Sequence, residues 1–159
     1  MTIAQNSIYI VAPLIGYLIG SVSFAFLIGR AHGVDIRTVG SKNVGATNLG
    51  RALGIRYFWM AFLLDAAKGF CPVLAVALAT VWLDAAHPGE IGRWAPLLTA
   101  GACVAGHTFP VWLKFRGGKG VATSFGALLG FWPIFTLGAL GAVLVFIGVF
   151  MVYRYVSLA

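Results

Sequence analysis

Four long apolar blocks constrain the fold of this chain more than any other feature of its sequence. They cover residues 8–29, 57–83, 94–112 and 121–152, and nearly all charged residues lie in the segments between them. A helix crosses a bilayer core of about 30 Å with roughly 20 residues. Only 9% of the residues are charged and 60% are hydrophobic, whereas a soluble domain carries roughly 25% charged residues. The sequence therefore predicts an all-α, polytopic integral membrane helix bundle.

The distribution of cations predicts how this bundle is oriented. The net charge of +7 reflects membrane topology rather than nucleic-acid binding, because the cations cluster in short loops that are retained in the cytoplasm. No Lys or Arg precedes the first block and Arg30 follows it, which places the N-terminus outside. The loop at 30–56, with five cations and one acid, is predicted to be cytoplasmic, and the loop at 84–93 to lie outside.

The number of membrane segments depends on the last apolar block. It is 32 residues long and contains Gly130-Phe-Trp-Pro133, so we expect a short helix to about Gly130, a turn, and a return helix from about Pro133. The chain then has about five membrane segments. In the first block, Gly16 and Gly20 form a GxxxG pair, which is typical of closely packed membrane helices.

A glycine-rich, basic stretch from Gly106 to Ser124 lies between the third and fourth blocks. It contains His107, three cations and Gly117-Gly-Lys-Gly120, and Val121 is the expected start of a helix. Glycine adopts positive φ without a Cβ clash, so backbone N–H groups can converge on an anion beside a helix N-terminus. The stretch is not a Walker A loop. It favours a phosphate site, with a tight cytoplasmic turn as the alternative.

Polar residues elsewhere point the same way. The segment 39–51 mixes glycines with hydroxyl and amide side chains, a density of donors that a simple linker does not need. Asp65 and Lys68 lie on one helical face inside the second block, which indicates a functional site or an internal ion pair. Cys71 and Cys103 lack metal-ligand spacing and are expected to be small buried side chains, so no metal and no cofactor are predicted.

These motifs together resemble those of the bacterial membrane-bound acyl-phosphate:glycerol-3-phosphate acyltransferases. The resemblance runs from about residue 8 to the end of the chain. It identifies residues 1–159 as a single transmembrane acyltransferase domain of a family with about seven spans. The matching segments are Gly20-Ser21, Asp35-Ile-Arg37, Gly40-Ser-Lys-Asn-Val-Gly-Ala-Thr-Asn48 with Arg51, Asp65-Ala-Ala-Lys-Gly69, Gly106-His107, Phe109-Pro110, Lys114-Phe-Arg-Gly-Gly-Lys-Gly-Val-Ala-Thr123 and Arg154-Tyr-Val-Ser157.

The resemblance implies a reaction, its substrates and its site. A fatty acyl group passes from acyl phosphate to the 1-hydroxyl of glycerol 3-phosphate, forming lysophosphatidic acid for phospholipid biosynthesis at the bacterial inner membrane, with the Gly-rich motifs on the cytoplasmic side. The implied partners are glycerol 3-phosphate, acyl phosphate, membrane lipid and the enzyme that supplies acyl phosphate. The implied catalytic residues are Arg37, Ser41, Asn43, His107 and Lys119, and the residues implied to bind substrate or phosphate are Gly40, Gly45, Thr47, Asn48, Arg51, Lys68, Gly117, Gly118, Gly120, Thr123 and Ser124.

The chemistry needs no strong base. The His-x4-Asp pair of another acyltransferase class is absent, because His32, His87 and His107 are followed at that spacing by Arg37, Gly92 and Trp112. Acyl phosphate is a mixed anhydride with a good leaving group, so positioning and charge stabilisation can supply most of the rate. The resemblance implies that the departing phosphate accepts the hydroxyl proton.

The sequence also departs from the family pattern. Ser23 stands where relatives usually have proline, and Lys42 where glycine is frequent. The family's third motif, a cytoplasmic cluster of His, Asn, Arg and Glu, has no counterpart, so we expect an incomplete chain that turns over little by itself. Two alternatives stay open from the sequence: a small anion transporter or channel subunit, and a catalytically inactive membrane fragment.

Overall fold

The computed structural model describes residues 3–86 and 94–131, and beyond these residues 136–138, 140, 141, 143–145 and 148. All regular secondary structure in this described part is helical, which confirms the predicted all-α class. The elements are α1 (Ile3–Gly20), α2 (Phe24–Ala31), α3 (Ala46–Leu53), α4 (Ile55–Ala86), α5 (Ala95–Thr108), the 3-10 turn η1 (Val111–Leu113) and α6 (Val121–Leu129).

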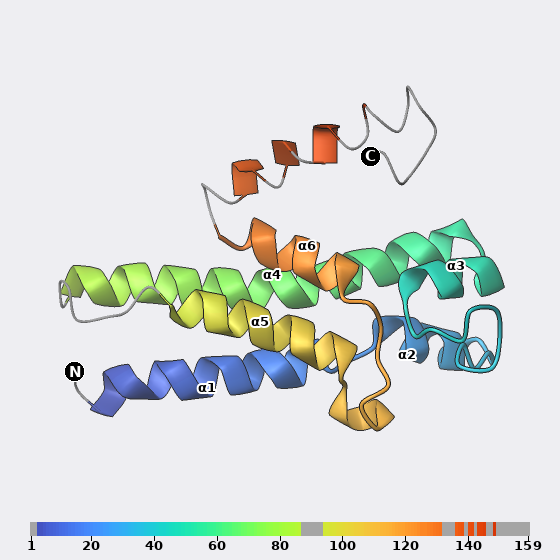
Figure 1. Cartoon of the computed structure of the whole chain (residues 1–159), viewed down its shortest axis with the longest axis horizontal. Coiled ribbons are helices and arrows are strands. Elements are labelled where there is room, and N and C mark those ends of the chain that lie inside the picture. The colour runs from blue at the N-terminus through green and yellow to red at the C-terminus, as the bar shows by residue number, and fades with distance from the viewer. Residues whose placement is uncertain are drawn as a thin grey trace.

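The long helix α4 organises the bundle. Figure 1 shows α4 running antiparallel to α1 and α5, with the short helices α2 and α3 at one end. α1 packs mainly on α5, and α4 packs on α3, α5 and α6. Because α1 and α5 run in the same direction, the segments that follow them reach the same end of the bundle. This arrangement brings the two predicted motifs together.

Small residues set the spacing between α1 and α5. A Cβ on Gly20 would lie 2.2 Å from the carbonyl oxygen of Cys103, and one on Gly106 would lie 2.2 Å from that of Tyr17. Neither distance leaves room for a methyl group, so the backbones approach as closely as glycine permits. The prediction of close packing through Gly16 and Gly20 is confirmed.

The first apolar block is not one helix. The block is long and apolar enough to cross a membrane, as predicted, but its helix is interrupted, because α1 ends at Gly20 and α2 begins at Phe24. Ser23 has extended backbone angles, and its Oγ accepts a hydrogen bond from the Phe26 N–H at 3.3 Å, which caps α2. The loop predicted at 30–56 likewise contains the last two residues of α2, all of α3 and the first two residues of α4.

Other boundaries follow the sequence closely. α6 begins at Val121, as expected, and α5 ends at Thr108, two residues before Pro110, which cannot continue a helix. Among the residues that the structure describes, two segments are long and apolar enough to cross a membrane by length and composition, residues 7–31 (across the break) and 55–83. α5 has 14 residues and α6 nine. The predicted return helix from Pro133 falls mostly outside the described residues, so the count of five segments stays a prediction.

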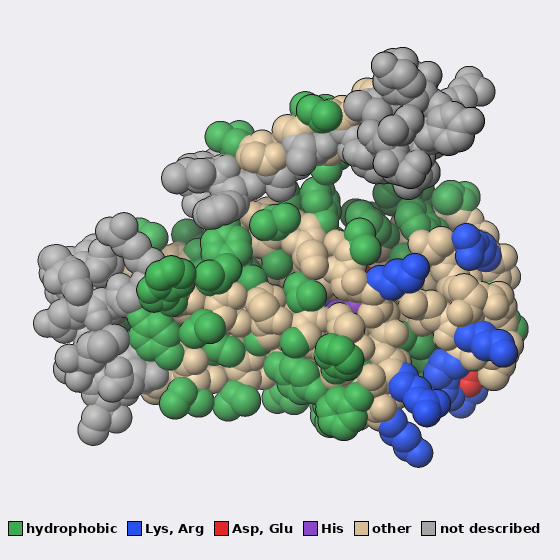
Figure 2. Space-filling view, in the orientation of Figure 1, with side chains coloured by type: hydrophobic (Ala, Val, Ile, Leu, Met, Phe, Trp, Pro, Cys, Tyr) green, Lys and Arg blue, Asp and Glu red, His purple; other side chains and the backbone are tan. Residues whose placement is uncertain are grey.

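The surface is that of a protein in contact with lipid. Large apolar side chains on α1 and α4 are exposed, including Ile10, Leu63, Val81 and Trp82. Figure 2 shows hydrophobic side chains along the body of the bundle and Lys and Arg gathered at one end. Cys71 is exposed on α4, contrary to the expected burial, whereas Cys103 is buried, and both are free thiols.

Candidate functional site

The two glycine-containing motifs meet around one cavity of about 520 Å³. Thr47 and Arg51 lie four residues apart on α3 and so line it from one helical face. His107 reaches it from the end of α5, and Lys119 from the second motif. The predicted site residues that line this cavity are Ser41, Asn43, Gly45, Thr47, Asn48, Arg51, His107, Lys119 and Gly120.

Asn48 builds the first motif from inside. Its side chain is 1% exposed, and its Nδ2 donates to the carbonyl oxygens of Ile36, Val39 and Asn43. Its Oδ1 accepts the N–H of Ser41 at 2.9 Å. These bonds give Asn48 a structural role, in which a single amide fixes the loop that presents Ser41 and Asn43, while its implied role in substrate binding stays a prediction.

Gly40 makes this arrangement possible. Its φ is 53°, in the left-handed region, and a Cβ there would lie 2.4 Å from Asn48 Oδ1. Lys42 adopts a φ of 58° in the same loop. This left-handed backbone explains why glycine suits that position. A residue with a Cβ is held there at a cost of about 1 kcal/mol.

The second motif does not use its glycines in the expected way. The Gly117 N–H donates to the Thr108 carbonyl at 3.1 Å, and the Gly118 N–H donates to the His107 carbonyl at 3.0 Å. The prediction that these two amides converge on an anion is wrong, because both are bonded to the last turn of α5. The glycines instead allow close approach: a Cβ on Gly118 would lie 2.2 Å from Nε2 of His107.

The anion-binding potential lies at the next residues. Gly120 has a φ of 77° and precedes α6, and it lines the cavity together with Lys119, Val121 and Ala122. The first N–H groups of a helix carry partial positive charge and lack partners within the helix. The exposed ammonium of Lys119 and the N-terminus of α6 therefore border the same space, as the sequence predicted.

An apolar wall, which the sequence did not predict, completes the cavity. Phe58 and Phe62 are four residues apart on α4 and both line the cavity. Their rings stack with centroids 5.9 Å apart. Their spacing was the available signal, but such a pair on an apolar helix is ordinarily lipid-facing. Here Phe58 lies against Gly50 of α3, and the ring of Phe62 lies 6.4 Å from that of Phe125 on α6.

Arg37 lies in a second, more polar cavity of about 930 Å³. Its guanidinium binds Asp35 through Nε–H···Oδ1 at 2.9 Å and NH2···Oδ2 at 2.8 Å. These hydrogen bonds, together with one from the Arg37 backbone N–H, lower the pKa of Asp35 to about 2. The same pairing raises the pKa of Arg37. The cations lining this cavity are Arg37, Lys42, Lys114 and Arg116, and Ser41 and Asn43 line both cavities.

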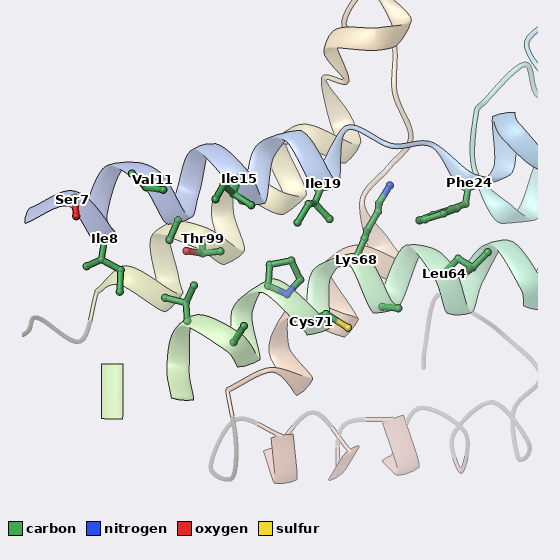
Figure 3. A pocket seen from close by; sticks show the side chains of 15 residues that line it. Ser7, Ile8, Val11, Ile15, Ile19, Phe24, Leu64, Lys68, Cys71 and Thr99 are labelled. Atoms are coloured by element: carbon green, nitrogen blue, oxygen red, sulfur yellow. The ribbon is translucent and has the colours of Figure 1, made fainter. Parts of the chain in front are cut away.

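Some predicted residues are not brought to the first cavity. Thr123 is fully buried, its carbonyl oxygen lies against Gly69 of α4, and neither it nor Ser124 lines the space. Gly117 lines the second cavity. Lys68 instead lines a third, apolar cavity of about 780 Å³ between α1 and α4, where Figure 3 shows it extending from α4 toward the connection between α1 and α2.

Metal ligation has no candidate in the described part of the chain, where no group of three His, Cys, Asp or Glu side chains could hold an ion. The polar atoms around the first cavity are hydroxyl, amide, imidazole, guanidinium and ammonium groups. Such a donor set suits phosphate and hydroxyl ligands.

Comparison with known proteins agrees with this geometry. The sequence model described as glycerol-3-phosphate acyltransferase matches residues 10–159. A glycerol-3-phosphate acyltransferase of Aquifex aeolicus is 44% identical over 146 residues, which are 92% of this chain and 70% of that protein. One of Albidiferax ferrireducens is 46% identical over 156 residues, 98% of this chain and 66% of that protein. The chain thus spans about two thirds of the length of these relatives.

Solved structures show the same fold. The crystal structure of PlsY, an integral membrane glycerol 3-phosphate acyltransferase in its glycerol 3-phosphate form, superposes with a TM-score of 0.78 at 41% identity, covering 94% of this chain and 69% of that one. The lysophosphatidic acid form superposes with a TM-score of 0.76 at 40% identity. A family model over nearly the whole chain, close relatives and a shared membrane fold lead to one conclusion: this chain is an integral membrane protein of the glycerol-3-phosphate acyltransferase family.

Proposed function

We propose that the chain binds glycerol 3-phosphate and acyl phosphate and transfers the acyl group to the 1-hydroxyl, producing lysophosphatidic acid and phosphate. One observation carries this proposal. Arg51, Lys119 and the N-terminus of α6 surround a cavity that also has an aromatic wall from Phe58 and Phe62. Cations, helix amides and hydroxyl groups suit a phosphate, and the aromatic wall suits the acyl chain.

The residues present can supply positioning and charge stabilisation. In the reaction the C1 oxygen forms a bond to the acyl carbon, and the bond from that carbon to the phosphate oxygen breaks. The hydroxyl proton passes to the departing phosphate, which leaves with the bonding electrons. Arg51 and Lys119 stabilise the negative charge that develops on the leaving group, and Ser41 and Asn43 orient the hydroxyl.

The second cavity has a role before the chemical step. Its cations, including Arg37, Lys42 and Lys114, attract phosphorylated substrates toward Ser41 and Asn43, which separate it from the first cavity. A site at this end of the bundle lies at the boundary between lipid and water, where a soluble headgroup and an acyl chain can both reach it.

We also propose the orientation that the cation distribution indicates. The N-terminus lies outside, the chain has five membrane segments, and the loops carrying Ser41 and Lys119 face the cytoplasm of a bacterial inner membrane. The gathering of Lys and Arg at one end of the bundle (Figure 2) supports this orientation, because positively charged loops are retained inside.

The test measures glycerol 3-phosphate binding by titration calorimetry of the purified chain in detergent, with glycerol as the control ligand. Acyl transfer is assayed with acyl phosphate and labelled glycerol 3-phosphate. Because the chain spans about two thirds of the length of its relatives, the assay also uses a chimera. In this chimera the chain is followed by the remaining third of the Aquifex aeolicus protein. We expect Lys119→Ala to weaken glycerol 3-phosphate binding at least tenfold, as a lost charge-assisted hydrogen bond costs about 1.5–3 kcal/mol.

Arg56→Ala is the matched control, since Arg56 is exposed at the start of α4 and lines neither cavity. Equal losses in the two variants would mean that only net charge attracts the ligand. The proposed function would be contradicted if the chain bound glycerol and glycerol 3-phosphate equally and if neither the chain nor the chimera transferred the acyl group.

A further inference from the structure

The break between α1 and α2 leaves backbone polar groups without helical partners inside an apolar bundle. A helix end exposes N–H and C=O groups, and in lipid each such group must be satisfied within the protein. Two of these groups flank Ser23, namely the carbonyl of Val22 on one side and the N–H of Phe24 on the other.

A buried ion pair on α4 satisfies both groups. Lys68 Nζ donates to the Val22 carbonyl oxygen, and the Asp65 carboxylate accepts the Phe24 N–H. The two side chains lie 2.9 Å apart, between Lys68 Nζ and Asp65 Oδ1, and both residues are at most 4% exposed. The ammonium of Lys68 thus lies at the carbonyl of Val22, and the carboxylate of Asp65 lies at the N–H of Phe24. Each charged group therefore faces the backbone group that it can bond, which the attraction between the two charges alone does not require.

The break is tied to the site along two paths. Ser23 Oγ donates to the Val44 carbonyl at 3.2 Å, and Val44 directly follows Asn43, which lines both polar cavities. On the other side, Asp65 Oδ1 lies 3.8 Å from Nδ1 of His107, which lines the first cavity. The pair therefore lies between the helix break and two elements that shape the site.

We propose that Asp65 and Lys68 are positioning residues, which hold the α1–α2 break through directional hydrogen bonds and thereby place α2 and the 41–45 loop at the site. The inference rests on the proposed function only for its effect on ligand binding. The position of α2 itself is independent of what the site binds.

Two neutral double variants separate this role from that of an ordinary buried ion pair. Asp65→Asn/Lys68→Gln keeps an acceptor for Phe24 and a donor for Val22, although Gln is one atom shorter than Lys. Asp65→Leu/Lys68→Met removes both hydrogen bonds. It also leaves no unpaired buried charge, and such apolar replacements of ion pairs generally fold.

The first readout is the position of α2. Spin labels at Leu27 and Leu78, exposed on α2 and α4, are introduced into a background of Cys71→Ala and Cys103→Ala, and their distance distribution is measured by electron paramagnetic resonance. We expect Asp65→Asn/Lys68→Gln (the amide pair) to keep the distance distribution of the parent protein. We expect Asp65→Leu/Lys68→Met (the apolar pair) to shift or broaden that distribution. The second readout is glycerol 3-phosphate affinity, expected within about fivefold of the parent for the amide pair. For the apolar pair it is expected to fall about 100-fold, the effect of a displacement of about 1 Å at a site.

Each outcome bears on the proposal. An apolar pair that matches the parent in both distance and affinity overturns it, because the hydrogen bonds would then position nothing. If the amide pair does not keep the parent's distance between the labels at Leu27 and Leu78, the argument from directional hydrogen bonds is overturned. Should the parent not bind glycerol 3-phosphate at all, the proposed function fails while the distance measurement still decides the role of Asp65 and Lys68.

Discussion

Replacing Gly118 by alanine tests whether the contact between the second motif and α5 matters for binding. The new Cβ would lie 2.2 Å from Nε2, 3.0 Å from Cε1 and 3.1 Å from Cδ2 of His107. An ordinary contact begins at 3.4 Å, so the ring and the loop must separate by about 1.2 Å. The His107 side chain is only 6% exposed and its ring is rigid, so the loop itself has to move.

The expected magnitude follows from this displacement. Overpacking of this kind costs about 1–3 kcal/mol, and movement of the loop also weakens the hydrogen bond from the Gly118 N–H to the His107 carbonyl. Lys119 is the next residue and moves with the loop. Since misplacement by about 1 Å can reduce the effectiveness of a site about 100-fold, we expect glycerol 3-phosphate affinity to fall 10- to 100-fold with no change in net charge.

The assay combines titration calorimetry with thermal unfolding followed by tryptophan fluorescence in detergent. Gly101→Ala is the control, because a Cβ there meets nothing within 4 Å and should be neutral or stabilise α5 by about 0.5–1 kcal/mol. The double variant Gly118→Ala/His107→Ala removes the clashing ring and should recover stability. Unchanged affinity and unchanged unfolding temperature in Gly118→Ala would refute the reasoning and leave the loop as a simple turn.

Three further predictions concern orientation, pH and backbone strain. Single cysteines at Lys42 and Glu90, in a background without Cys71 and Cys103, should be labelled from opposite sides of the membrane; labelling from one side would end the five-segment topology. The pKa of Asp35 is lowered from 3.8 to about 2, so its pairing with Arg37 stabilises the 33–38 loop fully above pH 3.8 and is lost as the pH falls toward 2. The protection of the backbone amides in that loop against hydrogen exchange, relative to their intrinsic rates at each pH, should therefore fall over this window in the parent but not in Asp35→Asn. Lys42→Gly relieves a left-handed φ of 58° and should raise thermal stability by about 1 kcal/mol, whereas Lys42→Ala, which keeps the Cβ, should not.

The sequence by itself determined the class, the motifs and several boundaries. The length of the apolar blocks and their lack of charged residues required membrane helices. In lipid every backbone N–H and C=O group must be paired within the protein, and a helix pairs these groups within its own segment. The start of α6 at Val121 was predicted, and Pro110 explains the end of α5, since proline and the glycine-rich segment act locally. The motifs around Ser41 and Lys119 were recognisable because their residue types suit phosphate wherever they occur.

The tertiary structure alone decided which groups are available to a ligand. The amides of Gly117 and Gly118 and the side-chain amide of Asn48 looked free in the sequence, but their partners are carbonyls brought close by folding, in α5 and in the 36–43 loop. The break at residues 21–23 was likewise invisible to hydropathy, because two serines barely lower the mean hydropathy of the apolar segment 7–31, which is 2.1. Its backbone groups are satisfied by Asp65 and Lys68, more than forty residues away. Periodicity and local propensity carry no information on such distant hydrogen bonds, and these bonds determine which residues face the cavity.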